Sequence, residues 1–164
     1  MKRVYKVLSV CLVVLGLVCP GCRPSPTAQL EENKAIVRLM IEELDKANWA
    51  LFNELHAPNF VYHGPASPKP LTREELEQFI RMLYAAFPDL HHTIEDMIAE
   101  GDKVVARFSI RGTHKGEFQG IPATGKKVTL TVTIIFHIAG GKISEAWEEA
   151  DMMGFMRQLG AIPG

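Results

Sequence analysis

The fold is decided by residues 128–138, VTLTVTIIFHI. Every second residue from Val128 to Ile138 is apolar, and threonine fills most of the positions between. Because successive side chains of a strand point to opposite faces of a sheet, this alternation predicts a long strand with one buried and one exposed face. The pair Gly140-Gly141 follows directly and is typical of a hairpin turn.

Three neighbouring stretches continue the same pattern. Residues 93–99 and 104–111 alternate in the same way on either side of Gly101-Asp102, and residues 142–149 predict a last strand after the hairpin. Strands that follow one another through short turns predict an antiparallel meander in this half of the chain.

The first half of the chain has helical periodicity instead. Residues 29–46 place apolar side chains at helical spacing, and Asn48 can cap a second short helix that Pro58 ends. Residues 60–63 predict a short strand, and Thr72 with Glu75 has the spacing of a capping box that begins a third helix. Helices followed by a meander predict an α+β fold. Its N-terminal helices pack on one face of a curved, mostly antiparallel sheet and leave a pocket between the two layers.

The N-terminus predicts export. Lys2, Arg3 and Lys6 precede the apolar run 7–18, which has the length of a secretory signal. Cys22 follows a small residue, as the modified cysteine of a bacterial lipoprotein does. We therefore predict a signal peptide over residues 1–21, a tether over 22–28 with Cys22 as the lipidation site, and one domain over 29–164. The expected location is the cell envelope, with a membrane anchor through the N-terminal lipid. A secreted or periplasmic protein is the alternative.

Composition and motifs argue against several classes of partner. After the signal, 15 lysine and arginine residues stand against 19 acidic residues, a net charge of −4, and no basic stripe suggests a nucleic-acid partner. His91-His92 is the only histidine pair, and adjacent strand residues point to opposite faces, so no metal site is expected. With Cys22 at the anchor, no thiol nucleophile is expected in the domain, and no cofactor motif is present.

The acidic segment 145–151 is the main candidate for chemistry. On a strand, Glu145, Trp147 and Glu149 share one face, and Glu148 shares the other with the small residues Ser144 and Ala146. A carboxylate beside apolar walls has its charged form disfavoured, which makes Glu148 a candidate general base. The alternative is a solvated strand edge. For Asp151, a helix cap is sufficient to explain the residue.

Other candidates could orient a ligand or line its pocket. His114 and His137 could position a polar group or carry a proton, although a hydrogen-bonded structural histidine is the commoner case. We expect Tyr62, His63, Phe87 and Phe136 as the candidates for the lining of the ligand pocket, although for Phe87 and Phe136 a place in the core is the commoner case.

Several segments taken together resemble the SnoaL-like polyketide cyclases, also called ester cyclases. They are residues 87–90 (FPDL), 100–104 (EGDKV), 112–126 (GTHKGEFQGIPATGK), 141–147 (GKISEAW) and 157–160 (RQLG). The likeness covers residues 28–160. It implies the cone-shaped fold of nuclear-transport-factor-2-like proteins, and a cofactor-free intramolecular aldol closure in which an acidic residue removes a proton next to a carbonyl.

The resemblance also implies site residues. The family's acidic base falls on Glu148, three residues before the shared acid Asp151, with glutamate in place of aspartate, and the family's histidine falls on His114. Three hypotheses follow: a cyclase or isomerase acting on a small hydrophobic carbonyl compound, a non-catalytic lipoprotein that binds a small hydrophobic ligand, and an interaction role in which the sheet forms a homodimer. The third is compatible with either of the others.

Overall fold

The computed structural model describes residues 25–65 and 67–163. The helices are α1 (Pro26–Leu44), α2 (Trp49–Leu55), α3 (Arg73–Ala86) and α4 (Met152–Leu159). The strands are β1 (His56–His63), β2 (Leu71–Thr72), β3 (His91–Glu100), β4 (Lys103–Thr113), β5 (Lys127–Ala139) and β6 (Lys142–Ala150). The predicted α+β class is confirmed.

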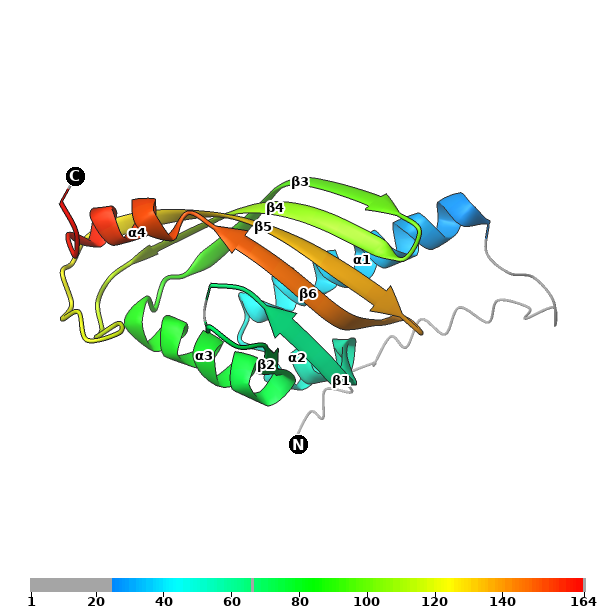
Figure 1. The fold of residues 1–164 in the computed structure, drawn as a ribbon, viewed down its shortest axis with the longest axis horizontal. Helices are drawn as coiled ribbons and strands as arrows, with labels where there is room; N and C mark the ends of the chain where they lie inside the picture. Colours follow the sequence, from blue (N-terminus) through cyan, green and yellow to red (C-terminus); the bar gives the residue numbers. More distant parts are fainter. Residues whose placement is uncertain (1–24, 66, 164) are drawn as a thin grey trace, which may run out of the picture.

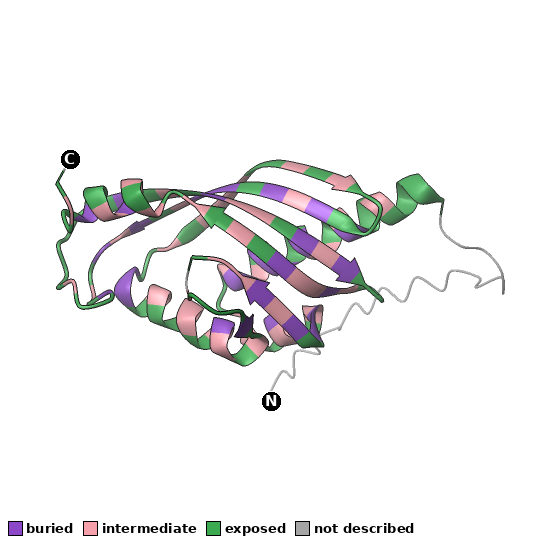
Figure 2. Cartoon of the chain, in the orientation of Figure 1, coloured by how far each residue is buried: buried purple, intermediate pink, exposed green. Residues whose placement is uncertain are grey.

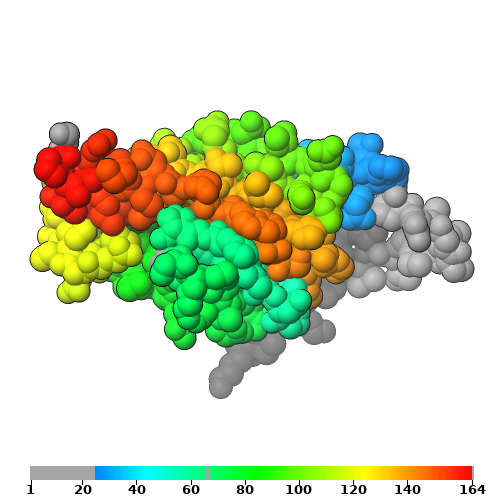
Figure 3. All heavy atoms as spheres, in the orientation of Figure 1, coloured from blue at the N-terminus to red at the C-terminus, as the bar shows by residue number. Residues whose placement is uncertain are grey.

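All six strands form one curved sheet in the order β2-β1-β6-β5-β4-β3, and only the pair β1–β6 is parallel. Helix α1 runs behind the long strands and α3 lies beside β1 and β2 (Figure 1). None of the helices in the described part of the chain covers the opposite face of the sheet, where the side chains of β4, β5 and β6 form the surface (Figure 3). The predicted arrangement, with helices on one face, is therefore confirmed.

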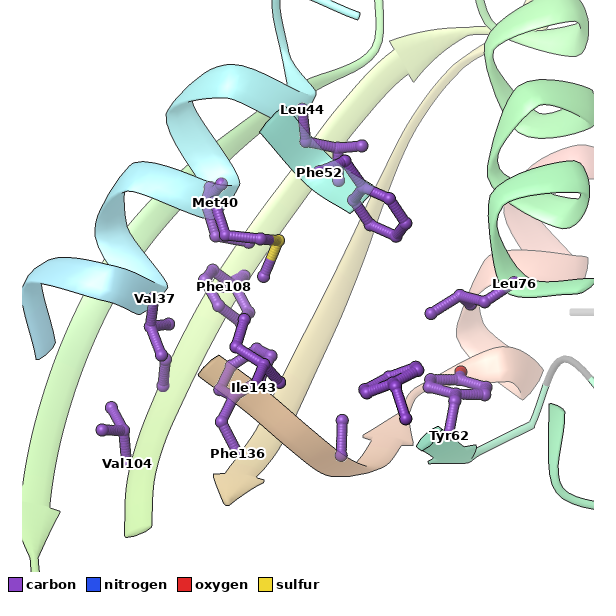
Figure 4. Close-up of a cluster of buried hydrophobic side chains, with 14 of the residues drawn as sticks. Val37, Met40, Leu44, Phe52, Tyr62, Leu76, Val104, Phe108, Phe136 and Ile143 are labelled. Carbon is purple, nitrogen blue, oxygen red and sulfur yellow. The ribbon is translucent and has the colours of Figure 1, made fainter. Parts of the chain in front are cut away.

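Residues 128–138 form the predicted long strand with one buried face. Val128, Val132 and Phe136 are buried, whereas the threonines between them are exposed or half-buried, and bands of buried and exposed residues follow the strands in Figure 2. The buried face meets the helices: Met40 of α1 points at Phe108 of β4 (Figure 4). Burial of large apolar side chains, each worth about 1.5–3 kcal/mol, joins the two layers.

Local signals in the sequence set the ends of most elements. Thr72 and Glu75 form the predicted capping box, and the side chain of Asn48 accepts from the backbone of Leu51 to cap α2. Gly140 and Gly141 both have positive φ, as a tight hairpin between β5 and β6 requires.

Two predicted boundaries are wrong. Helix α1 begins at Pro26, inside the predicted tether, because Ser25 caps it and proline is favoured at the first helical position. Pro58 does not end α2; it lies inside β1, which begins at His56 rather than at residue 60. The register of β1 against β6 shifts between His56 and Val61, so the missing N–H of Pro58 falls where the pairing is irregular.

The signal peptide predicted over residues 1–21 and the lipidation site Cys22 lie outside the described residues. Within residues 25–65 and 67–163, no helix is long and apolar enough to cross a membrane.

Candidate active site

A cavity of about 120 Å³ lies between the concave face of the sheet and the helices, with walls drawn from α1, α2, α3 and β1 as well as from β3 to β6. Four lining residues carry polar side chains: His56, Tyr62, His92 and Glu148. The remaining lining residues are apolar or glycine, and the predicted pocket residues Phe87 and Phe136 are among them. The cavity is thus an apolar chamber with a few polar groups, the usual composition of a small-molecule site.

Glu148 reaches this cavity because of its position in β6. Ala146 is 3% exposed and Trp147 is 37% exposed, so the predicted parity of the strand is confirmed. Glu148 pairs in register with Ile134 of β5, which also lines the cavity. Glu148 is half-buried and itself lines the cavity.

The environment changes the acidity of Glu148. Burial among apolar side chains raises the pKa of Glu148 to about 7, a hydrogen bond from Tyr62 acts in the opposite direction, and the charge of Glu149 adds to the rise. A carboxyl group whose pKa lies near neutrality can accept a proton and return it at physiological pH.

Tyr62 is the nearest polar partner of Glu148. It lies on β1, paired in parallel with Ala146 of β6, and its hydroxyl lies close enough to the carboxyl group of Glu148 to lower the pKa of that group. Burial and the neighbouring Glu148 both raise the pKa of Tyr62, so the hydroxyl stays protonated. Gly64 leaves room for this pair, since a Cβ there would overlap the Tyr62 hydroxyl and lie 3.0 Å from the Cβ of Glu148.

His56 is a cavity residue that was not predicted from the sequence. It is 2% exposed, and its Nδ1 donates to the carbonyl oxygen of Phe52 at 2.6 Å. Burial lowers the pKa of His56 to about 4, so the ring is neutral near pH 7. Its period-two spacing from Phe60 and Tyr62, on the same face of β1, is the signal that could have found it.

From the sequence, His92 enters only as a possible metal ligand that points away from its neighbour His91, and the structure places the two side chains on opposite faces of β3. His91 and His92 both reach the carboxylate of Asp45, with Nδ1 to oxygen distances of 2.6 Å each. Asp45 caps the end of α1 beside the edge strand β3, so its two oxygens meet residues from both faces of that strand. His92 also lines the cavity, whereas His91 is exposed.

His114 lies near the cavity but not in its wall. The residue is fully buried, its ring stacks on Phe87 at 5.0 Å between centroids, and its Nδ1 is 3.1 Å from the hydroxyl of Thr124. Because the Thr124 backbone N–H also donates to Nδ1, the proton of a neutral ring is on Nε2, which has no partner among the described residues.

The other predicted polar residues lie elsewhere. His137 contacts Asp102 at 2.5 Å in the turn between β3 and β4, and Asp151 caps α4 by accepting from the backbone of Gly154. His63 donates or accepts at 2.8 Å with Glu145 and stacks on Trp147, which places it on the outer face of the sheet. The structure therefore joins Glu148 to Tyr62, and not to His114, His137 or Asp151.

No cluster of three or more histidine, cysteine or acidic residues suited to a metal ion occurs in the described parts of the chain. What the cavity offers chemically is a carboxyl group of near-neutral pKa, a protonated tyrosine hydroxyl and two histidines. These groups can move protons and orient oxygen atoms.

Comparison with known proteins identifies the family and agrees with the fold. The family description "SnoaL-like polyketide cyclase" matches residues 34–159. The chain belongs to this family. Among curated relatives, the aklanonic acid methyl ester cyclases DauD of Streptomyces sp. (strain C5) and DnrD of Streptomyces peucetius are each 29% identical over 131 residues. The matches cover 76% of this chain and 80% and 88% of the two relatives.

Solved structures of SnoaL-like proteins have the same fold. IdmH, a putative polyketide cyclase from Streptomyces antibioticus, superimposes with a TM-score of 0.72 at 30% identity, covering 78% of this chain and 98% of its own. AclR, a putative hydroxylase from Streptomyces galilaeus, reaches 0.75 at 25% identity, covering 82% and 99%. Because one fold carries both names, the chemistry of this SnoaL-like protein has to be argued from its own cavity.

Proposed function

We propose that this protein is a cofactor-free cyclase or isomerase of small hydrophobic carbonyl compounds, with Glu148 as its general base. The observation that carries the proposal is the carboxyl group of Glu148, which lies in an apolar cavity with a pKa of about 7. The apolar walls disfavour the charged form of the carboxylate, which makes it a stronger base, and they also exclude water from the cavity.

In the proposed reaction, the ionised Glu148 removes a proton from the carbon next to a carbonyl, and the electron pair moves onto the carbonyl oxygen to give an enolate. For ring closure, the enolate carbon attacks a second carbonyl of the same molecule, and the protonated Glu148 returns its proton to the new alkoxide. For isomerisation, the proton returns to a different carbon. Either cycle is balanced without another reactant.

Tyr62 supports this chemistry in two ways. Its hydroxyl lies beside the Glu148 carboxyl group and limits the rise of that group's pKa. Once Glu148 has taken a proton, the same hydroxyl is available to donate to an enolate oxygen, a charge that develops only during the reaction. The names of the curated relatives, both methyl ester cyclases, support ring closure as the reaction class.

The volume of the cavity bears on the substrate. At about 120 Å³ it lies below the usual range of ligand pockets, about 300–1,000 Å³, and so favours a small molecule. A single-ring ketone such as 4-(4-hydroxyphenyl)butan-2-one is a suitable probe because it carries exchangeable hydrogens next to its carbonyl.

The test is the exchange of these hydrogens for deuterium in D₂O, followed by proton NMR. The wild-type protein should accelerate the exchange, and Glu148→Gln should lose about 100-fold or more of the acceleration, which is the usual contribution of a general base. Glu145→Gln is the matched control, since it removes a carboxylate from the outer face of the same strand, where it pairs with His63. Undiminished exchange in a folded Glu148→Gln variant would refute the proposal.

A carrier that binds a small hydrophobic molecule without changing it is the second candidate. The apolar lining favours it, together with the placement of His114, His137 and Asp151 outside the cavity wall. Native mass spectrometry of the gently purified protein distinguishes the two: a co-purifying hydrophobic molecule that survives incubation unaltered supports the carrier, and its conversion supports the enzyme.

A further inference from the structure

We propose that His92, held by Asp45, is a second polar contact for the ligand at the end of the cavity opposite Glu148. The ligand class that follows is an elongated hydrophobic ketone with a hydroxyl group at its far end. This rests on the proposed function only in taking the ligand to be a ketone.

His92 faces the cavity through its register in the sheet. It pairs with Ile110 of β4, and Ile110 pairs with Leu130 of β5; both partners line the cavity. The side chain of His92 is only 8% exposed, so its ring is largely shielded from bulk solvent.

Asp45 fixes the ring of His92. The Nδ1 of His92 lies 2.6 Å from one carboxylate oxygen, and the backbone N–H of His92 donates to both oxygens at 3.3 and 3.1 Å. The hydroxyl of Tyr84 is 3.3 Å from the same carboxylate and 3.0 Å from the carbonyl oxygen of Leu44. Burial opposes the charge of Asp45, but the hydrogen bonds and charge of His92 outweigh it and hold the pKa of Asp45 below its ordinary value.

An ionised Asp45 needs a donor, so Nδ1 of His92 carries a proton and Nε2 is left for another partner. No described residue hydrogen-bonds Nε2 of His92. Nε2 of His114 is the only fully enclosed side-chain polar atom without a partner in the described residues, so Nε2 of His92 keeps some accessible surface, and the cavity is one of two hollows that His92 lines. A hydroxyl group suits this nitrogen because it can donate to a neutral ring and accept from a charged one.

The sheet separates His92 from Glu148 along a diagonal. Strand β3 lies three strand steps from β6, about 14 Å, and His92 is level with Leu130 while Glu148 is level with Ile134, about 13 Å further along β5. The two backbone positions are therefore about 19 Å apart across the sheet, and the two side chains, which line the same cavity and are each about 4–5 Å long, shorten the span between their polar atoms. A ligand that contacts both must therefore be long and narrow, with oxygens on the order of 10 Å apart.

The experiment compares two ketones that differ only at the far end. One is 4-(4-hydroxyphenyl)butan-2-one and the other is 4-(4-methylphenyl)butan-2-one, in which a methyl group of similar size replaces the hydroxyl. Isothermal titration gives the ratio of their dissociation constants for each protein. If the role of His92 were purely structural, its replacement would weaken the binding of both ketones by the same factor. The ratio of the two dissociation constants would then stay unchanged.

We expect the wild-type protein to favour the hydroxyl compound, and His92→Phe to move the ratio by at least about tenfold toward the methyl compound, because a buried hydroxyl without a partner is costly. His92→Gln, which keeps a polar group at the same end, should retain part of the preference and serves if His92→Phe does not fold. His91→Ala is the control, since it removes the exposed contact of Asp45 alone.

Three results would overturn the proposal: a ratio that His92→Phe and His92→Gln leave unchanged, an equal change in His91→Ala, or no binding of either ketone by the wild-type protein. Failure of the proposed function looks different. If the ratio depends on His92 but Glu148→Gln does not affect deuterium exchange, the proposed ligand contact of His92 is supported and the proposed enzyme function is refuted. If exchange depends on Glu148 and the ratio does not depend on His92, the reverse holds.

Discussion

The hydroxyl of Tyr62 lies beside the carboxyl group of Glu148 across the parallel pair of β1 and β6 and lowers its pKa. Burial raises the pKa of Glu148, the neighbouring hydroxyl lowers it, and burial is the larger effect. The result is a carboxyl group that changes charge near neutral pH inside an apolar cavity, and several measurable consequences follow from it.

The stability of the protein should depend on pH through Glu148. Its pKa is about 7 when folded, against an ordinary value of 4.5 for a solvated glutamate, so the folded state holds the extra proton between these values. Stability from this group is therefore complete below pH 4.5 and is lost as the pH rises to 7, by up to about 3 kcal/mol. Glu148→Gln should remove this loss and be relatively more stable at pH 8 than at pH 5. Urea unfolding of both proteins at the two pH values measures this. An equal difference at both would contradict the assignment.

Removal of the Tyr62 hydroxyl should move the activity profile. Because the hydrogen bond lowers the pKa of Glu148, Tyr62→Phe should raise it further and shift the midpoint of the deuterium-exchange rate from about pH 7 to higher pH. Tyr84→Phe removes another buried hydroxyl, which contacts Asp45 instead, and should leave the midpoint in place. A midpoint that stays or falls in Tyr62→Phe would show that the hydroxyl does not act on Glu148.

Gly64→Ala should separate Tyr62 from Glu148 without changing either. The new Cβ would occupy the place of the Tyr62 hydroxyl and lie 3.0 Å from the Cβ of Glu148, so the tyrosine must move. The exchange midpoint should shift in the same direction as in Tyr62→Phe, and the double variant should show little further shift. Ser67→Ala, a change in the same loop, is the control. Additive shifts in the double variant would mean that the two residues act independently.

Gly116→Ala should destabilise the fold through the backbone. A Cβ at Gly116 would lie 2.6 Å from the carbonyl oxygen of Ala85 and 3.0 Å from the Cα of Ala86, and these atoms belong to the end of α3. We expect a loss of about 1–3 kcal/mol, the usual cost of overpacking. Urea unfolding checks it, with Lys115→Ala as control because its backbone N–H also donates to Ala86 and is retained. Equal free energies of unfolding of the two variants would show that the end of α3 can shift to accommodate the new Cβ at little cost, and would contradict the prediction.

The sequence also predicts that Cys22 carries a lipid. Expressed as the full chain in a bacterial host, the protein should incorporate labelled palmitate and sediment with membranes, and Cys22→Ser should do neither. Cys19→Ser should still be labelled, because Cys19 lies in the predicted signal peptide. Label in the Cys22→Ser protein would contradict the predicted site.

Local patterns in the sequence predicted much of the fold. The alternation in residues 128–138, the capping box of Thr72 and Glu75, and the glycine pair at 140–141 each express short-range geometry, which a linear sequence carries directly. The same reasoning gave the parity of β6 and placed Glu148 on the face of Ala146. The boundaries at Pro26 and Pro58 were missed, since capping by Ser25 and irregular pairing in β1 decide them.

The sequence by itself thus determined the class of the fold, the faces of its strands and the place of Glu148 on the same face of β6 as Ala146. Only the tertiary structure decided which polar groups share the cavity. Asp45 and His92 are 47 residues apart in the sequence. Tyr62 and Glu148 lie on the first and the last strand in chain order, which pair in parallel. Strand periodicity specifies the face on which a side chain lies but not its neighbours, because those depend on strand order and helix placement. The pKa of Glu148 depends on them too, since desolvation is a property of all the atoms around a group.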